Sequence, residues 1–355
     1  MINSTERSDI LVFNCYLCHV SFLLTCYVCS TKIGEISDIS KCFENFVSQA
    51  LRVLTRIYAA ELRNYKAKTM EILGIVFWYK PELTSAIKSL ESYIYDIKEL
   101  IIWNNSTFED LLEFDKILKP LPYYQKIKLM GEGKNKGLSY PINLAMNRVL
   151  HEKFDSLLTM DQDSIWVNFK EYTKIIETNK NYRASIFRPN FEQRISEHEL
   201  EPTYGFLINS GTIYGKNAII KNGKMQESFF VEGLDTEYGF RAYTHNIMIY
   251  TVIKGEIEHN VNDQEQVRFM GLSMHKCKYS PSRLFGITYS HTIMIREFPF
   301  RIRLSLIRSL MTTFGIKLLL SIILTDKDKT SRISSYFSGI IKGLTSKLPQ
   351  ICYFN

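Results

Sequence analysis

A regular alternation of short apolar segments with helical patterns constrains the fold more than any other feature of the sequence. Residues 71–77 have the length and apolar character of one buried strand. A helical pattern follows over 82–94, and a second strand is predicted over 98–103. A third strand over 126–130 and a helix over 142–152 continue the alternation. Strands that alternate with helices indicate βαβ units, so we expect an α/β fold with a mostly parallel sheet.

A fourth apolar run, 157–160, ends directly in two carboxylates, Asp161 and Asp163. In open α/β sheets, ligands bind just beyond the carboxyl ends of the strands. Oxygen ligands at that edge suit Mg²⁺ or Mn²⁺, which proteins commonly hold with one or two carboxylates and the phosphates of a substrate. The alternative interpretation is a polar turn after a core strand, because carboxylates are common in turns.

The second half of the chain contains another group of acidic residues. Asp235 is expected near the start of a helix, where a carboxylate can cap the backbone. Glu237 can pair with Arg241 four residues further on, so a purely structural role for this group is one interpretation. Further strands are predicted over 182–187, 203–209 and 247–253.

The formal charge of +7 is distributed unevenly along the chain. Residues 278–355 contain twelve Lys or Arg and three Asp or Glu, a charge of +9, so residues 1–277 carry −2. Because the basic character belongs to the tail, it argues against a nucleic-acid-binding body. Basic residues beside aliphatic and aromatic ones suit peripheral contact with an anionic membrane leaflet. An ordinary helical layer over the core is the alternative for this tail.

Residues 1–69 are interpreted as an N-terminal extension. The apolar run Ile10–Cys29 is long enough to span a membrane, but polar residues interrupt it, and it lacks the basic start and cleavage site of a secretory signal. A membrane anchor, a helical addition and a segment without function all stay open. Two Cys-x-x-Cys pairs in this run have a spacing found in zinc sites, although only seven residues separate them. Two cysteines lie beyond residue 70, so we predict that this larger part of the chain has no disulfide framework and is cytosolic.

Several short motifs follow one another in a fixed order. They are Asn135-Lys136-Gly137-Leu138, Asn143, Phe154–Ser164 (FDSLLTMDQDS), Asn209-Ser210-Gly211, Asp235-x-Glu237-x-x-x-Arg241, His259 and Tyr279–Phe285 (YSPSRLF). This ordered set resembles the inverting family 2 glycosyltransferases, and within them the bacterial rhamnosyltransferase-like branch. The match covers residues 71–260 and extends more loosely to about residue 345.

The resemblance implies a GT-A type fold, in which a mostly parallel, Rossmann-like sheet is flanked by helices and followed by a C-terminal helical extension. It places a glycosyltransferase domain at residues 70–275. Residues 276–355 then form a basic and aliphatic helical region, for which membrane association is expected.

The resemblance also implies an activity. It indicates metal-dependent, inverting transfer of a sugar from a nucleoside-diphosphate donor, with rhamnose or another deoxysugar as the transferred group. The implied acceptor is a glycan or a lipid-linked glycan in cell-surface polysaccharide synthesis. The expected location is the cytoplasmic face of the inner membrane.

Each matched residue takes a role from the resemblance. Asp161 and Asp163 would bind Mg²⁺ or Mn²⁺ with His259 as a helper, and Asp235 would be the catalytic base. A carboxylate with an ordinary pKa of roughly 4 can serve as a base when it takes the proton late in the reaction. The nucleotide is expected at Tyr79, Asn104, Asn135 and Gly137. The donor and acceptor pocket is expected at Gln162, Ser210, Gly211, Glu237 and Arg241.

Two loops depart from the pattern of the branch. Trp78-Tyr79-Lys80-Pro81 stands where the branch has T-Y-N-P, and Trp103-Asn104-Asn105-Ser106 stands where it has V-D-N-x-S. The alternative function is therefore a non-catalytic nucleotide-sugar or glycan-binding protein on the same fold, because a fold alone does not imply activity. A nucleotidyltransferase is disfavoured, because the loop Gly131–Gly137 lacks the spacing of a phosphate-binding P-loop.

Overall fold

The computed structural model describes residues 69–259, 266–269, 272–275, 279–312, 315–325, 328–347 and 353–354. The expectations for the apolar run Ile10–Cys29 and its cysteine pairs lie outside the described residues. Among the helices that are described, none combines the length and the hydropathy that a membrane span requires.

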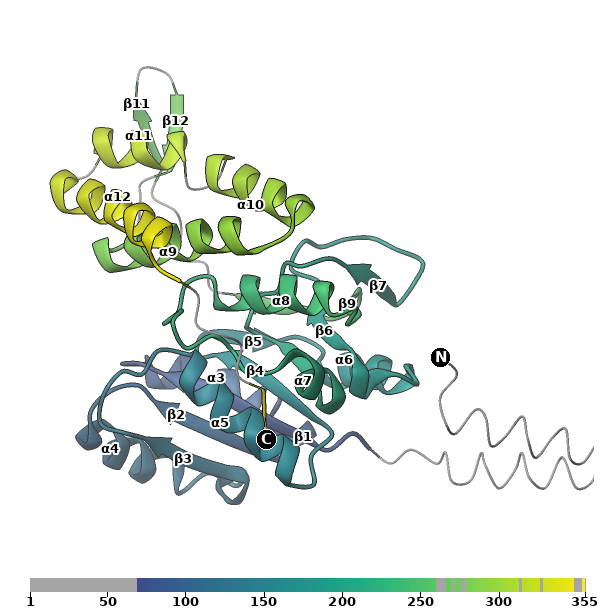
Figure 1. Ribbon diagram of the computed structural model, residues 1–355. Helices are drawn as coiled ribbons and strands as arrows, with labels where there is room; N and C mark the ends of the chain where they lie inside the picture. Colours follow the sequence, from purple (N-terminus) through teal and green to yellow (C-terminus); the bar gives the residue numbers. More distant parts are fainter. Residues whose placement is uncertain are drawn as a thin grey trace, which may run out of the picture. The chain divides into compact units, whose positions relative to one another are not determined.

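An eight-stranded sheet forms the centre of the described chain (Figure 1). Its strands are β1 (Ile72–Trp78), β2 (Glu99–Asn104), β3 (Ile127–Gly131), β4 (Ser156–Asp161), β6 (Ile186–Pro189), β7 (Leu200–Thr203), β8 (Thr212–Gly215) and β9 (Ile249–Val252). Their order is β3-β2-β1-β4-β8-β6-β9-β7. Strand β8 runs antiparallel to both of its neighbours, and β7 runs antiparallel to β9, while the other pairs are parallel. The predicted α/β fold with a mostly parallel sheet is confirmed.

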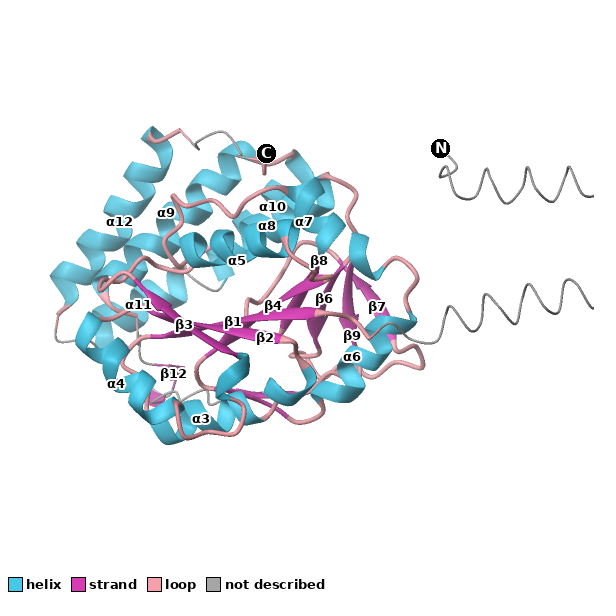
Figure 2. Ribbon diagram, turned by 90° about the horizontal axis from the view of Figure 1, so that it is seen from below, coloured by secondary structure: helices cyan, strands magenta, loops and turns pink. Residues whose placement is uncertain are grey.

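Helices cover both faces of this sheet (Figure 2). Side chains of β1 alternate between the faces, with Leu73 and Ile75 in one core cluster and Ile72 and Val76 in the other. The first cluster includes residues of α5 (Ser139–His151), α7 (Lys216–Asn222) and α8 (Leu234–Thr244). The second includes residues of α3 (Leu83–Glu91), α4 (Phe108–Leu118) and α6 (Phe169–Thr178). The period-two alternation of a strand buried on both faces therefore produces two separate helix-covered cores.

The chain between β7 and β8 differs from the prediction. A strand was expected over 203–209, but β7 ends at Thr203 and a loop follows. The loop bends at once, because the Phe206 N–H donates to the Tyr204 carbonyl at 3.0 Å. Burial still alternates along this loop as it would in a strand, since Leu207 is buried while Phe206 and Ile208 are exposed. The apolar alternation there comes from a loop that folds over the core, and the strand prediction is wrong.

Two short antiparallel ribbons lie outside the main sheet. One pairs β5 (Ser164–Trp166) with β10 (Ile257–His259), and the other pairs β11 (Gln266–Phe269) with β12 (Leu272–His275). In the first ribbon, His259 lies opposite Ser164. This pairing brings the end of β10 beside the residues that follow β4.

In the described part of the chain, four helices follow the sheet, as the predicted C-terminal extension requires. They are α9 (Pro281–Glu297), α10 (Phe300–Thr312), α11 (Ile316–Thr325) and α12 (Lys329–Thr345). Helices α9 and α12 pack closely at Gly339, where an added Cβ would lie 2.1 Å from the Thr288 hydroxyl oxygen. That hydroxyl donates to the Tyr336 carbonyl at 2.9 Å. Because Gly339 has no side chain, α9 and α12 can approach each other closely at this point.

Candidate functional site

The strand order reverses between β1 and β4, and we call the region at the carboxyl ends of these strands the crevice. From β1 the chain adds β2 and β3 on one side, and it then returns to place β4 on the other side. Open α/β sheets bind ligands at such a point. Tyr79 follows β1, Asn104 ends β2 and Asp161 ends β4. Residues far apart in the sequence therefore meet at one edge of the sheet.

The Asp161–Asp163 segment is attached to the turn after β1. The Gln162 side chain accepts a hydrogen bond from the Tyr79 N–H at 2.8 Å and donates one to the Tyr79 carbonyl at 3.4 Å. The Asp161 N–H donates to the Ser210 hydroxyl oxygen at 3.3 Å. Gln162, predicted to lie in the donor and acceptor pocket, thus positions the two carboxylates against β1.

Asp163 is available for a ligand. Its side chain is half-buried and makes no hydrogen bond or ion pair with any residue that the structure describes. Within the same described residues, no three His, Cys, Asp or Glu side chains cluster as a metal site would. Asp161 and Asp163 still suit Mg²⁺ or Mn²⁺, because these ions commonly take one or two carboxylates and complete their shell with phosphates and water. The backbone of His259 lies next to this segment, but its side chain is outside the described residues.

Ser210 and Gly211 lie beside the end of β4. The Gly211 N–H donates to the Thr159 carbonyl at 2.8 Å, and Ser210 is buried under Asp161. Gly211 has a φ of 76°, and an added Cβ would lie 2.3 Å from the Ile257 side chain. Only glycine meets both conditions without strain. The structure therefore brings these two predicted pocket residues to the carboxylates at the crevice.

Asp235 lies in the first turn of α8. Its Oδ1 accepts a hydrogen bond from the Thr236 N–H at 2.8 Å. Burial raises the pKa of Asp235 to about 6, and the negative charges of Asp161 and Glu232 act in the same direction. The sequence predicts an ordinary pKa of roughly 4 for this carboxyl, so the raised pKa differs from that prediction.

Glu237 and Arg241 form the ion pair expected from their spacing. Two guanidinium nitrogens donate to the two carboxylate oxygens at 2.7 and 2.8 Å. Arg241 also donates to the carbonyls of Asn222 and Lys224. Both charged side chains are buried, and their charged groups are occupied by these contacts. They therefore hold the start of α8, which carries Asp235, and do not line an open pocket.

The Asn104 side chain is not turned towards a nucleotide. It is fully buried, accepts a hydrogen bond from the Ser106 N–H at 2.9 Å and donates one to the Thr107 carbonyl at 2.6 Å. The prediction that its amide contacts the base is therefore corrected, because these local bonds shape the turn before α4. The neighbouring Asn105 was missed, although it accepts from the Lys136 N–H and donates to the Gly137 carbonyl. The sequence feature that could have identified Asn105 is its position in the motif Trp103-Asn104-Asn105-Ser106.

The other three residues predicted to bind the nucleotide are Tyr79, Asn135 and Gly137. Asn135 is exposed and accepts a hydrogen bond from the Gly137 N–H at 2.9 Å, which closes a tight turn. Gly137 is buried within this turn. Tyr79 has 51% of its surface exposed.

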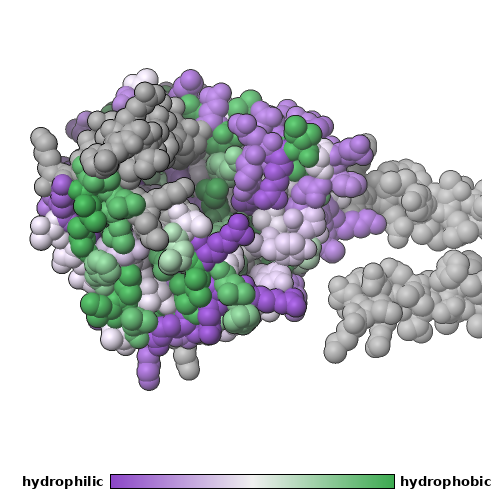
Figure 3. Space-filling view, turned by 90° about the horizontal axis from the view of Figure 1, so that it is seen from above, coloured by the Kyte–Doolittle hydropathy of each residue, from purple (hydrophilic) through white to green (hydrophobic). Residues whose placement is uncertain are grey.

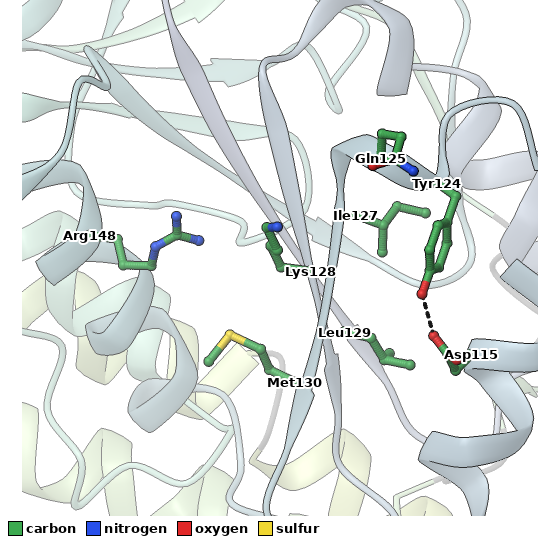
Figure 4. A pocket seen from close by; sticks show the side chains of 8 residues that line it. All are labelled: Asp115, Tyr124, Gln125, Ile127, Lys128, Leu129, Met130 and Arg148. Atoms are coloured by element: carbon green, nitrogen blue, oxygen red, sulfur yellow. Dashed lines mark hydrogen bonds between the residues drawn. The ribbon is translucent and has the colours of Figure 1, made fainter. Parts of the chain in front are cut away.

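A hollow of about 560 Å³ lies elsewhere, along the edge strand β3 (Figure 4). At its wall the Tyr124 hydroxyl donates to Asp115 at 2.6 Å. None of the predicted site residues lines it. Its size does not make it the functional site, since the paired carboxylates and the strand reversal lie at the crevice.

Several known proteins are similar to this chain. No family model matches the sequence. One curated relative, the dTDP-rhamnosyl transferase RfbF of Shigella flexneri, is 23% identical over 299 residues, which cover 77% of this chain and 95% of that protein. S. aureus TarS 1–349 in complex with UDP-GlcNAc matches with a TM-score of 0.45 and 13% identity, over 79% of this chain and 82% of that one. The mannosyltransferase PcManGT from Pyrobaculum calidifontis, in complex with GDP-Man and Mn²⁺, matches with a TM-score of 0.49 and 11% identity, over 82% and 94%.

Proposed function

We propose that this chain, a rhamnosyltransferase-like glycosyltransferase by its likeness to the curated dTDP-rhamnosyl transferase, moves a deoxysugar from a nucleoside-diphosphate donor to a glycan or lipid-linked glycan. One observation carries this proposal. The negative charge of Asp161, at the end of β4, acts on Asp235, at the start of α8, and helps to raise its pKa. A transferase needs one group beside the departing diphosphate and another beside the incoming hydroxyl, and this arrangement supplies a carboxylate for each.

Asp161 and Asp163 are the residues that would hold Mg²⁺ or Mn²⁺ in this proposal. The bound ion supplies positive charge that neutralises the diphosphate as it departs. Gln162 keeps the two carboxylates in place through its bonds to Tyr79. Tyr79 in turn offers its exposed ring to the base of the donor.

Asp235 would act as the base that removes the proton from the acceptor hydroxyl. Its raised pKa makes it a stronger base than an ordinary carboxylate, which favours proton transfer near neutral pH. A single base and a single displacement imply inversion at the anomeric carbon. The oxygen of the acceptor forms the new bond, the bond to the diphosphate breaks, and the proton remains on Asp235.

The donor can be identified by ligand-dependent stabilisation. Nucleotide sugars, beginning with dTDP-rhamnose, are added to the purified protein with Mn²⁺, and the midpoint of thermal unfolding is measured. The stabilising donor is then tested for transfer and for hydrolysis. Stabilisation without turnover of the donor would favour the non-catalytic binding protein, and the absence of both would reject the proposed function.

The pH dependence of transfer provides a further prediction. Since Asp235 must be ionised to accept a proton, kcat/KM should fall about tenfold per pH unit below about 6. This loss should not reflect unfolding. A carboxyl whose pKa is raised by folding stabilises the folded state most below its unfolded pKa of 3.8, and that contribution is lost as the pH rises through about 6. Donor binding, measured by thermal shift over the same pH range, serves as the control. A flat kcat/KM profile between pH 5 and 7 would contradict the role of Asp235.

The proposal includes residues 70–275 as the transferase domain and residues 276–355 as the part that contacts a membrane. Helices α10 and α12 carry rows of exposed apolar residues at helical spacing (Figure 3 shows this face). The rows are Phe300, Leu304, Ile307 and Met311 in α10, and Phe337, Ile341 and Leu344 in α12. Helices α10, α11 and α12 together contain seven Lys or Arg and no Asp or Glu. An anionic lipid surface complements both features, whereas a second copy of the chain would repel this charge.

Membrane contact predicts binding to vesicles of phosphatidylglycerol and phosphatidylcholine, and weaker binding to phosphatidylcholine alone. Leu304→Gln and Leu344→Gln should each lower the partition constant for vesicles about tenfold, because each removes roughly 1.5 kcal/mol of apolar burial. Leu112 of α4 is equally exposed, so Leu112→Gln is the matched control. Co-sedimentation measures the bound fraction. Equal losses in all variants, or none, would contradict this surface. The proposed location at the cytoplasmic face of the inner membrane depends on the same result.

A further inference from the structure

Lys80 has a backbone conformation that its side chain does not favour. Its φ is 46°, in the left-handed region where Gly and Asn are common and where other L-residues are strained. Pro81 follows it, and a residue before proline normally adopts an extended conformation. The lysine side chain and the following proline therefore both disfavour the left-handed conformation of Lys80. A strained position of this kind persists only where the surrounding structure holds it in place.

The contacts around Lys80 come from the edges of the crevice. Its N–H points to the Ser106 hydroxyl at 3.4 Å, which connects it to the turn after β2. The preceding Tyr79 is bonded through its backbone to Gln162, which lies between the two predicted metal-binding carboxylates. Lys80 thus lies where the turns after β1, β2 and β4 meet.

Lys80 forms no ion pair with any residue that the structure describes. The side chain is exposed, and its Nζ lies 5.8 Å from the centre of the Tyr79 ring. By contrast, Lys136 on the neighbouring loop is paired with Glu132 at 2.7 Å. Lys80 therefore presents an unpaired cation at the edge of the crevice.

We propose that Lys80 binds the diphosphate of the donor, and that its strained backbone directs the ammonium group into the crevice. The inference rests on the proposed function, because it requires an anionic donor at this site. A compact ammonium group with rotatable donors is suited to phosphate oxygens, and the bond gains strength because both partners are charged. The left-handed conformation then lowers the stability of the fold but is kept because it serves donor binding.

This explanation predicts opposite effects on stability and on binding. Lys80→Asn removes the charge and places a residue that tolerates the left-handed region, so the midpoint of thermal unfolding should rise by about 1–3 °C. The affinity for dTDP-rhamnose, and for dTDP, UDP and GDP tested with Mn²⁺, should fall about tenfold for each ligand that the wild type binds. Lys80→Arg should retain most of that affinity. The salt dependence of binding should also weaken in Lys80→Asn.

Gln193 offers a matched control, because it is exposed and has a φ of 51°. Gln193→Asn should raise the unfolding midpoint in the same way and leave nucleotide affinity unchanged. Unchanged affinity in Lys80→Asn, while the wild type binds nucleotide, would overturn the role of Lys80 and leave the proposed function intact. A lower unfolding midpoint in Lys80→Asn would also overturn it, since Lys80 would then support the fold. Failure of the wild type to bind any of these ligands would reject both proposals.

Discussion

Replacing Asp235 with Asn is expected to lower the rate of sugar transfer by about 10²–10⁴-fold while donor binding is unchanged. The amide has the shape of the carboxyl but cannot accept the proton of the acceptor hydroxyl. Because burial raises the pKa of Asp235, the charged form is unfavourable in the folded chain at neutral pH. The Asn variant should therefore unfold at an equal or slightly higher temperature. Single-turnover transfer, donor affinity and the unfolding midpoint are the three measurements.

Asp115→Asn is the control for that experiment. Asp115 accepts a hydrogen bond from Tyr124 beside the hollow at β3, away from the crevice. Its replacement should leave transfer unchanged. If Asp235→Asn keeps wild-type turnover, Asp235 is not the base, and another group must take the proton.

Replacing Asp163 with Ala is expected to abolish metal-dependent transfer, with a loss of about 10³-fold or more. Asp163 has no partner among the described residues, so its removal should leave the fold intact. The loss should be accompanied by weaker donor binding in Mn²⁺, because the ion links the carboxylate to the diphosphate. Transfer and nucleotide affinity are measured across a Mn²⁺ titration.

The wild type treated with EDTA provides the comparison for Asp163→Ala. Its activity should disappear and return when Mg²⁺ or Mn²⁺ is added. The variant should resemble the EDTA-treated protein at every metal concentration. Wild-type activity in the variant, or activity of the wild type that resists EDTA, would remove Asp163 from the proposed metal site.

Patterns that depend on neighbouring residues could be predicted from the sequence. The buried strands β1, β2 and β4 follow from apolar runs, and their carboxyl ends follow from the polar residues after them. The pair of Glu237 and Arg241 follows from helical spacing alone. These features need only the period of a helix or strand. The resemblance to a known branch then supplied the order in which the motifs occur.

Features that depend on contacts between distant residues could not be predicted in this way. The burial that raises the pKa of Asp235 comes from tertiary packing, which no spacing in the sequence encodes. The Asn104 amide was assigned to a base, but two bonds within its own turn occupy it. The loop after β7 has the alternation of a strand without its pairing partner. The conformation of Lys80 also depends on three strands that meet only in the folded chain.

The hydrogen bonds between Gln162 and Tyr79 have a consequence for the order of events during binding. One side chain joins the segment that would hold the cation to the turn that faces the nucleotide. Occupancy of either part should restrain the other, so cation and nucleotide should bind cooperatively, each raising the affinity of the other by the same factor. In Gln162→Leu this reciprocity should shrink, and nucleotide titrations at low and saturating Mn²⁺ would reveal it. Equal cooperativity in both proteins would assign the communication to the ligands themselves.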